Sequence, residues 1–171
     1  MRRPGASEAI PYYSTYIERV KSDDILGFLK DQLGEYGAFF RRISEEKSLT
    51  RYEPGKWSVR EVLGHITDTE RVFAFRGLWF ARGFESPLPS FDQDVGVRES
   101  RAHSRPWAAL VEELRDTRAA TVAQFAGLPP EAWQREGIAS GNRFSVNAIA
   151  YIIGGHLAHH AAILRERYGL A

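Results

Sequence analysis

Apolar residues recur at intervals of three and four along four stretches of the chain, which is the period of an amphipathic α-helix. These stretches cover roughly residues 22–43, 58–83, 104–127 and 145–169. No stretch shows strong strand alternation, and no internal repeat or low-complexity tract is visible. The pattern therefore predicts an all-α fold, a four-helix bundle in which each apolar stripe faces a shared core.

Start and stop signals support these boundaries. Ser58 and Glu61 form a Ser-x-x-Glu capping box at the beginning of the second helix. Ser145 is placed to cap the fourth helix, and Gly169 is placed to end it. The first helix is expected to begin after Ser22.

The segments outside the helices differ in character. Residues 84–104 form a connection far longer than the 2 to 8 residues usual between bundle helices, so the second and third helices are expected to run parallel. Residues 1–21 are expected to form an irregular arm that packs tyrosines onto the bundle, and residues 135–142 are expected to form a polar loop. The long connection is also a candidate lid, with four side chains available to a ligand: Phe91, Asp92, Gln93 and Asp94.

Composition narrows the function classes. A length of 171 residues suits one domain. The formal charge of +1, from 23 basic and 22 acidic residues, predicts no general attraction to nucleic acid or to anionic membranes. No secretory signal and no apolar run near the ~20 residues of a membrane span is visible, so we expect a cytoplasmic protein. The absence of cysteine excludes disulfides, a thiolate nucleophile and cysteine-ligated metals.

The fourth helix carries the strongest candidate chemistry. His156 and His160 lie one turn apart within its apolar stripe, the spacing at which two imidazoles reach one ion. An apolar face is a costly place for a polar ring without a partner. His65 lies at the inward edge of the second helix, and facing helices of bundles build metal sites. These three rings predict a metal centre with open coordination positions; the alternative is a set of core histidines bonded to carbonyls.

The ligand set limits the metal only in part. Nitrogen ligands without cysteine favour zinc or nickel, but they do not separate these from iron, cobalt or manganese. His159 lies about 60° away from the stripe. It is a candidate substitute for His160, or a residue beside the ligands or at the entrance of the site. His103 precedes the third helix and is expected to be solvated.

Charged residues on the second helix are weaker candidates. Asp68 follows His65 by three residues, where it would orient the ring or act as a base, the alternative being a surface charge. Glu70 is a candidate for the same roles, but it lies about 140° around the helix from His65 and is therefore expected to be a surface charge. Arg76 points in nearly the same direction as His65, so it is a candidate partner for an anionic ligand.

Three segments of the chain resemble the DinB-like/YfiT-like superfamily over about residues 12–170: GKWSVREVLGHITDTERVFAFR, ARGFESPLPSFDQD and YIIGGHLAHHAAILRERY. The resemblance implies a bundle of up-down-down-up order and a divalent metal held by His65, His156 and His160. It also implies a metal-dependent enzyme, often dimeric, and neither polymerase activity nor DNA binding. Members include transferases that join low-molecular-weight thiols to electrophiles, and others are regarded as hydrolases.

Two classes of function follow. In the first, the metal centre of a homodimeric enzyme activates a thiol cofactor or a water molecule for reaction with a small-molecule substrate, as a thiol S-transferase or a hydrolase. In the second, the protein is a non-catalytic metal or small-molecule binding module linked to stress. No nucleic-acid or membrane partner is expected in either case.

Overall fold

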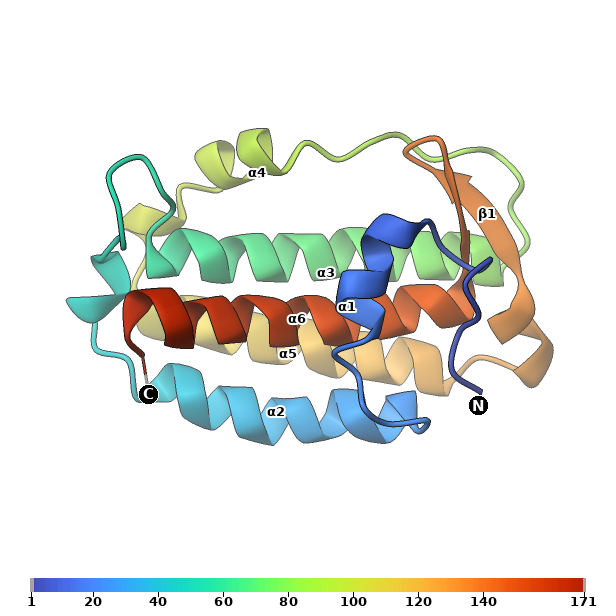
Figure 1. Cartoon of the computed structure of the whole chain (residues 1–171), viewed down its shortest axis with the longest axis horizontal. Helices are drawn as coiled ribbons and strands as arrows, with labels where there is room; N and C mark the ends of the chain where they lie inside the picture. Colours follow the sequence, from blue (N-terminus) through green and yellow to red (C-terminus); the bar gives the residue numbers. More distant parts are fainter. Residues whose placement is uncertain (1, 171) are drawn as a thin grey trace.

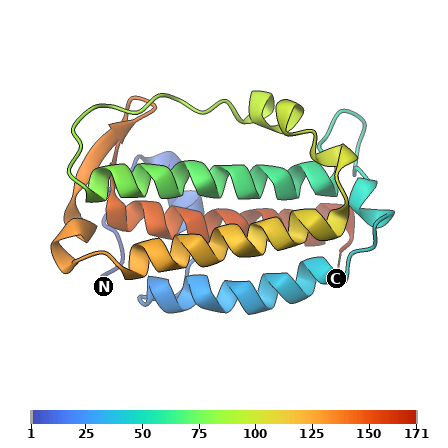
Figure 2. The ribbon, with the colours of Figure 1, turned by 180° about the vertical axis from the view of Figure 1, so that it is seen from behind.

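The computed structural model describes residues 2–170 and is built on four long helices that lie side by side (Figure 1). They are α2 (Ile25–Arg41), α3 (Val59–Ala81), α5 (Trp107–Ala126) and α6 (Val146–Tyr168). Figure 2 shows the same helices from behind, with α5 in front of α6. The chain is mostly helical, as the apolar pattern predicts. None of the helices in the described residues is long and apolar enough to cross a membrane.

Three of the helix ends are formed by the predicted capping signals. Ser58 accepts from the Glu61 backbone N–H and the Glu61 carboxylate accepts from that of Ser58, so the capping box is formed. Ser145 caps α6, and Gly169 ends it with a left-handed φ of 64°. The first long helix starts two residues later than predicted, because the side chain that caps it is that of Asp24.

The connection between α3 and α5 contains a helix that the sequence pattern did not predict. This helix, α4 (Gln93–Ser100), lies above the bundle (Figure 1) and is followed by the short 3₁₀ helix η3 (Ala102–Ser104). The Asp92 carboxylate accepts from the backbone N–H groups of Asp94 and Val95. That carboxylate, expected to be available to a ligand, is therefore used as a helix cap.

The segment expected to be a polar loop is part of a β-hairpin. Strands β1 (Glu136–Ala139) and β2 (Asn142–Ser145) pair antiparallel across a two-residue turn. Both turn residues have positive φ, 54° at Ser140 and 72° at Gly141, which is the backbone that such tight hairpins require. The expectation of a fold without strands is thus wrong at this point. Four-residue strands with few apolar side chains give too short a pattern to detect.

The N-terminal arm crosses α6 near the middle of the bundle (Figure 1). It contains the 3₁₀ helix η1 (Pro11–Tyr13) and the single-turn helix α1 (Ser14–Ile17). At one end, the Glu8 carboxylate accepts from the Ser145 hydroxyl at 2.7 Å. Further along, a Cβ on Gly155 would lie only 1.9 Å from the carbonyl oxygen of Tyr16. The arm is therefore in direct backbone contact with the helix that carries two of the three histidines.

Two apolar clusters fill the two ends of the bundle. Along α2 and α6 the chain passes first through the cluster that contains Leu29 and Ile149, and then through the one that contains Phe40 and Leu164. Along α3 and α5 it passes through them in the reverse order. In Figure 1, α3 and α5 accordingly run in one direction, and α2 and α6 in the other. Two further 3₁₀ helices, η2 (Lys47–Leu49) and η4 (Pro130–Gln134), lie outside the four long helices.

Candidate metal centre

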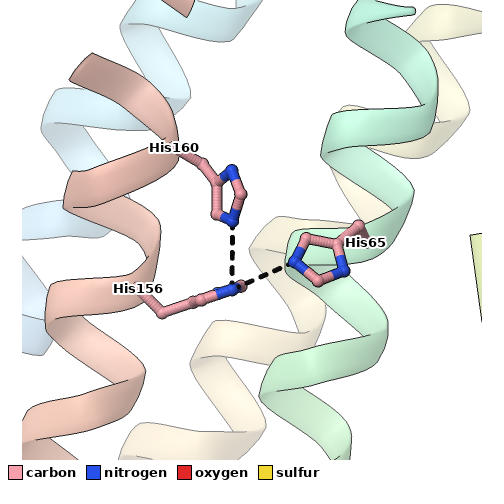
Figure 3. Close-up of side chains that lie close together, drawn as sticks. All are labelled: His65, His156 and His160. Atoms are coloured by element: carbon pink, nitrogen blue, oxygen red, sulfur yellow. Dashed lines mark hydrogen bonds between the residues drawn. The ribbon is translucent and has the colours of Figure 1, made fainter. Parts of the chain in front are cut away.

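The three predicted histidines come together between α3 and α6 (Figure 3). The Nε2 atom of His156 lies 3.1 Å from that of His65 and 3.1 Å from that of His160. One nitrogen from each ring lies within 4.8 Å of the other two. His65 and His156 are buried, and His160 is half-buried. Residues 91 positions apart in the sequence therefore converge on one point.

The geometry fits a bound cation better than a hydrogen-bonded cluster. A ring nitrogen of neutral imidazole has either one N–H or one in-plane lone pair, so Nε2 of His156 can form only one good hydrogen bond. It nevertheless faces two other Nε2 atoms at the same distance. Ligand nitrogens about 2.0–2.1 Å from a tetrahedral ion lie about 3.3 Å from one another. The spacing of these rings is close to that value.

Burial keeps the rings in the neutral form that a metal requires. It lowers the pKa of His65 to about 4, with a further contribution from the nearby His159 ring. Burial also holds the pKa values of His156 and His160 well below the usual 6.5, and repulsion from the neighbouring imidazoles adds to the effect. At neutral pH each ring thus has a lone pair to offer.

Neighbouring side chains fix the ring orientations. The Thr69 hydroxyl lies 3.4 Å from Nδ1 of His65, the nitrogen that faces away from the cluster. The indole ring of Trp57 lies 4.9 Å from the same imidazole. The edge of Tyr16 packs against His156 with ring centroids 5.3 Å apart. Thr69 is not among the predicted site residues, although its position one turn after His65 is the spacing at which such support is expected.

A cavity of about 100 Å³ opens beside the rings, and His65 and His156 form part of its wall. The rest of the wall comes from four separate segments: the N-terminal arm, α3, the long connection and the hairpin turn. Its aromatic and polar members include Tyr12, Tyr13, Tyr16, Phe73, Arg76 and Ser140. Phe91 and Gln93 also line it, so two of the four predicted lid residues reach the cavity.

Comparison with known proteins identifies the family. Residues 29–164 match the DinB superfamily. This chain belongs to the DinB superfamily. No curated protein matches the sequence significantly.

Solved structures share the fold of this DinB-superfamily chain. YfiT from Bacillus subtilis, described as a probable metal-dependent hydrolase with an unusual four-helix bundle topology, aligns with a TM-score of 0.70 and 17% identity over 98% of this chain and 94% of YfiT. A mycothiol-dependent maleylpyruvate isomerase aligns with a TM-score of 0.68 and 12% identity, over 85% of this chain and 61% of the isomerase. A histidine-to-alanine mutant of such an isomerase aligns with a TM-score of 0.70 and 11% identity, over 91% of this chain and 63% of the mutant isomerase.

The remaining predicted site residues of this DinB-superfamily chain lie at different distances from the rings. Arg76 lines the cavity, in agreement with its predicted direction. Asp68 forms an ion pair with Arg71 at 3.5 Å and is not among the cavity residues, so its catalytic role stays a prediction without a supporting contact. The His159 ring packs 5.1 Å from the His160 ring, outside the cluster. His103 is exposed, as expected.

The expectation that Glu70 is a surface charge is wrong. Its side chain is 2% exposed and accepts two hydrogen bonds from the Arg118 guanidinium, at 2.7 and 2.8 Å. Arg118 also donates to the Gln32 side-chain oxygen, and the Gln32 amide donates to the Gly154 carbonyl at 2.9 Å. This buried chain of polar groups ties α2, α3 and α5 to α6 two residues before His156.

Proposed function

We propose that this DinB-superfamily protein is a metal-dependent enzyme in which His65, His156 and His160 hold a divalent cation, zinc or nickel. The observation that carries the proposal is the position of the His156 Nε2 atom, 3.1 Å from each of the other two Nε2 atoms. A bound divalent cation supplies positive charge that stabilises an electron-rich atom of a substrate or cofactor. The adjoining cavity is where such a molecule would lie.

The cavity favours a thiol over water as the activated group. No aspartate or glutamate lines it among the described residues, so the wall offers no carboxylate base to remove a proton. A thiol loses its proton near pH 8.5, whereas bulk water has a pKa of about 15.7, so a thiol needs far less assistance. Because the chain has no cysteine, the thiol must come from a bound low-molecular-weight cofactor. One similar structure is described as mycothiol-dependent.

The residues of the chain have separate parts in this proposal. His65 is oriented by Thr69 and Trp57, and His156 is covered by Tyr16. The arm and the connection supply part of the wall of the cavity beside the rings. Hydrolysis is the second candidate, because YfiT is described as a probable metal-dependent hydrolase.

Other expectations belong with the proposed function. An up-down-down-up order of the long helices is supported by the order in which each helix passes through the two apolar clusters. A single domain, a homodimer, a cytoplasmic location, a small-molecule substrate and the lack of nucleic-acid and membrane partners stay predictions from the sequence.

Elemental analysis of the purified protein tests the metal centre. We expect about one divalent metal per chain in the wild type and its loss in His160→Ala, which removes one of three ligands from a half-buried position. His103→Ala removes an exposed histidine outside the cluster and is the matched control. His159→Ala should also keep its metal. Unchanged metal content in His160→Ala would contradict the assigned ligands.

A turnover assay then separates the reaction classes. Metal-loaded protein is incubated with low-molecular-weight thiols and a chloro-aromatic acceptor, and in parallel with simple esters and amides without thiol. Thiol-dependent turnover that is lost in His160→Ala supports the transferase. Ester or amide cleavage without thiol supports the hydrolase, and bound metal without turnover in either assay supports a binding module.

A further inference from the structure

Arg76 is buried without a counter-charge. The residue is 4% exposed, and its Nη2 atom donates to the Pro89 carbonyl at 3.1 Å and to the Ser140 hydroxyl at 2.9 Å. Within the described residues, no carboxylate oxygen lies within 4.0 Å of the guanidinium. Both hydrogen-bond partners are neutral, so they satisfy donors without balancing the charge.

Two other buried arginines are paired with carboxylates. Arg60 and Arg118, which are as buried as Arg76, form ion pairs with Glu45 and Glu70. Removing a charge from water is unfavourable unless an opposite charge compensates for it. Of these three buried guanidinium groups, the one that lines the cavity is the one without a carboxylate.

Arg76 also has hydrogen-bonding capacity left. A guanidinium has five N–H donors, and the Nε and Nη1 atoms of Arg76 have no partner among the described residues. Burial lowers the pKa of Arg76, but a guanidinium remains protonated at neutral pH. The group lines the same cavity as His65 and His156.

The rest of the cavity wall does not offset this charge. Its described residues include no aspartate or glutamate, and a histidine side chain provides no negative charge in either its neutral or its protonated form. A cation bound to neutral imidazoles would add positive charge to the same space. The electrostatics therefore favour an anionic ligand whether or not a metal is bound.

We infer that this cavity binds a small organic carboxylate, with the acid group on Arg76 and an apolar, flat body against Tyr13 and Phe73, toward the histidines. A planar carboxylate matches the fork of a guanidinium. The Phe73 ring lies 5.2 Å from the Arg76 guanidinium carbon, and Tyr13 packs edge-on against Phe73 at 5.8 Å. The inference deepens the proposed function by naming the substrate class, and only the placement of the body near the metal rests on that function.

Binding of benzoate and benzamide to chelator-treated, metal-free protein tests the inference. The two probes share a ring and differ in charge, and the absence of metal isolates the contribution of Arg76. Affinities are measured by isothermal titration calorimetry, and the Arg Nε resonances are followed by ¹⁵N NMR. Arg76→Gln removes the charge from the cavity, and Arg82→Gln removes an exposed charge from the end of the same helix as the matched control.

We expect the wild type and Arg82→Gln to bind benzoate at least about tenfold more tightly than benzamide, and Arg76→Gln to lose this preference, since a hydrogen-bonded charge contributes about tenfold to a hundredfold. Arg76→Lys keeps the charge without the fork and should retain part of the preference. If Arg76→Gln does not fold, the test rests on Arg76→Lys and on the preference of the wild type for benzoate over benzamide.

Equal affinity of the wild type for both probes would overturn the inference, as would benzoate binding that is unchanged in Arg76→Gln. Inorganic phosphate is the third probe, and phosphate binding tighter than benzoate binding would replace the carboxylate by a phosphoryl group and overturn the stated class. Because no metal is present, these outcomes are independent of the metal analysis. If the protein prefers benzoate but binds no metal, the result would support the anion site and contradict the proposed metal centre.

Discussion

Buried residues lie on more than one side of a single helix in this bundle. Glu70 lies on a different side of α3 from His65, yet both are buried, because α3 packs against α5 as well as against α6. A helix with two neighbours has two buried sides, so an angle away from the main apolar stripe does not by itself indicate solvent. The Glu70 side chain meets Arg118 in the second of these contacts.

Glu70→Gln should therefore reduce stability strongly. The variant leaves the buried Arg118 charge without a counter-charge, and breaking such a pair costs about 3–5 kcal/mol. Asp68→Asn, two residues earlier on the same helix, removes the carboxylate of a partly exposed pair with Arg71 and should cost at most about 1 kcal/mol. Unfolding in urea measures both values. Equal losses of stability in the two variants would show that burial does not make the Glu70–Arg118 pair more important than the Asp68–Arg71 pair.

The capping box predicts a dependence of stability on pH. Burial alone would raise the pKa of Glu61, but hydrogen bonds from Arg51 and from the backbone and hydroxyl of Ser58 outweigh it and lower the pKa below its ordinary value of 4.5. A carboxylate with a depressed pKa stabilises the folded state above the unfolded pKa, and this stabilisation is lost as the pH falls through the folded pKa.

Glu61→Gln isolates this contribution. The difference in unfolding free energy between the wild type and the variant should be about 1 kcal/mol at pH 7 and should shrink as the pH falls below 4.5. Urea unfolding at a series of pH values between 7 and 3 gives the difference directly. A difference that stays constant over this range would show that the ionised carboxylate is not the stabilising form.

At the site, the residues that could be predicted from the sequence are those that share one face of a helix. His156 and His160 share a stripe, and His65 and Arg76 share a direction on α3, so all four are found by counting residues. Tyr13, Tyr16 and Ser140 are not found in this way. They reach the cavity from the arm and from the hairpin turn, whose positions depend on tertiary contacts rather than on local periodicity.

At the scale of elements, long helices were predictable and short ones were not. The four long helices have 17 to 23 residues, so their apolar stripes repeat over several turns. Helix α4 has eight residues and buries only Val97, and each hairpin strand has four residues. Such elements are stabilised by caps, turns and neighbours, and these leave a weak pattern in the sequence.

The contact between the arm and α6 leads to a prediction at this scale. Gly155→Ala places a methyl group 1.9 Å from the Tyr16 carbonyl oxygen, so the arm has to move away. We expect a loss of about 1–3 kcal/mol in stability and faster hydrogen exchange at the arm amides of Tyr13 and Glu18, which are bonded within the arm.

Gly34→Ala is the control for this substitution. Position 34 lies in α2, is exposed and has no atom within 4 Å of an added Cβ, so alanine should stabilise the helix by about 0.5–1 kcal/mol. Hydrogen exchange followed by mass spectrometry compares the two variants. Unchanged protection of the arm in Gly155→Ala would mean that α6 yields instead of the arm.

At the scale of the whole molecule, a polar layer divides the core. The two apolar clusters lie at opposite ends of the bundle, and between them each long helix contributes buried polar side chains: Gln32 from α2, His65 and Glu70 from α3, Arg118 from α5 and His156 from α6. Glu70, Arg118 and Gln32 satisfy one another. The imidazole nitrogens remain as the part of the layer that a cation would complete.

Metal removal should therefore lower the stability of the entire bundle. At a free metal concentration about a thousandfold above Kd, binding adds about 4 kcal/mol to the free energy of unfolding, which corresponds to a change in Tm on the order of 10 °C for a chain of this size. Differential scanning calorimetry with and without chelator measures the shift. His160→Ala should show no response to chelator, and a similar shift in both proteins would place the metal elsewhere.

The arm has a consequence for how this scaffold diversifies. It supplies three tyrosines to the cavity wall, whereas the imidazole cluster is built by α3 and α6 alone. Replacement of the arm residues other than Tyr16, which packs on His156, would thus reshape what the cavity admits while the three imidazoles keep their neighbours. New selectivity can arise by exchange of one peripheral module, without renewed selection of the buried centre.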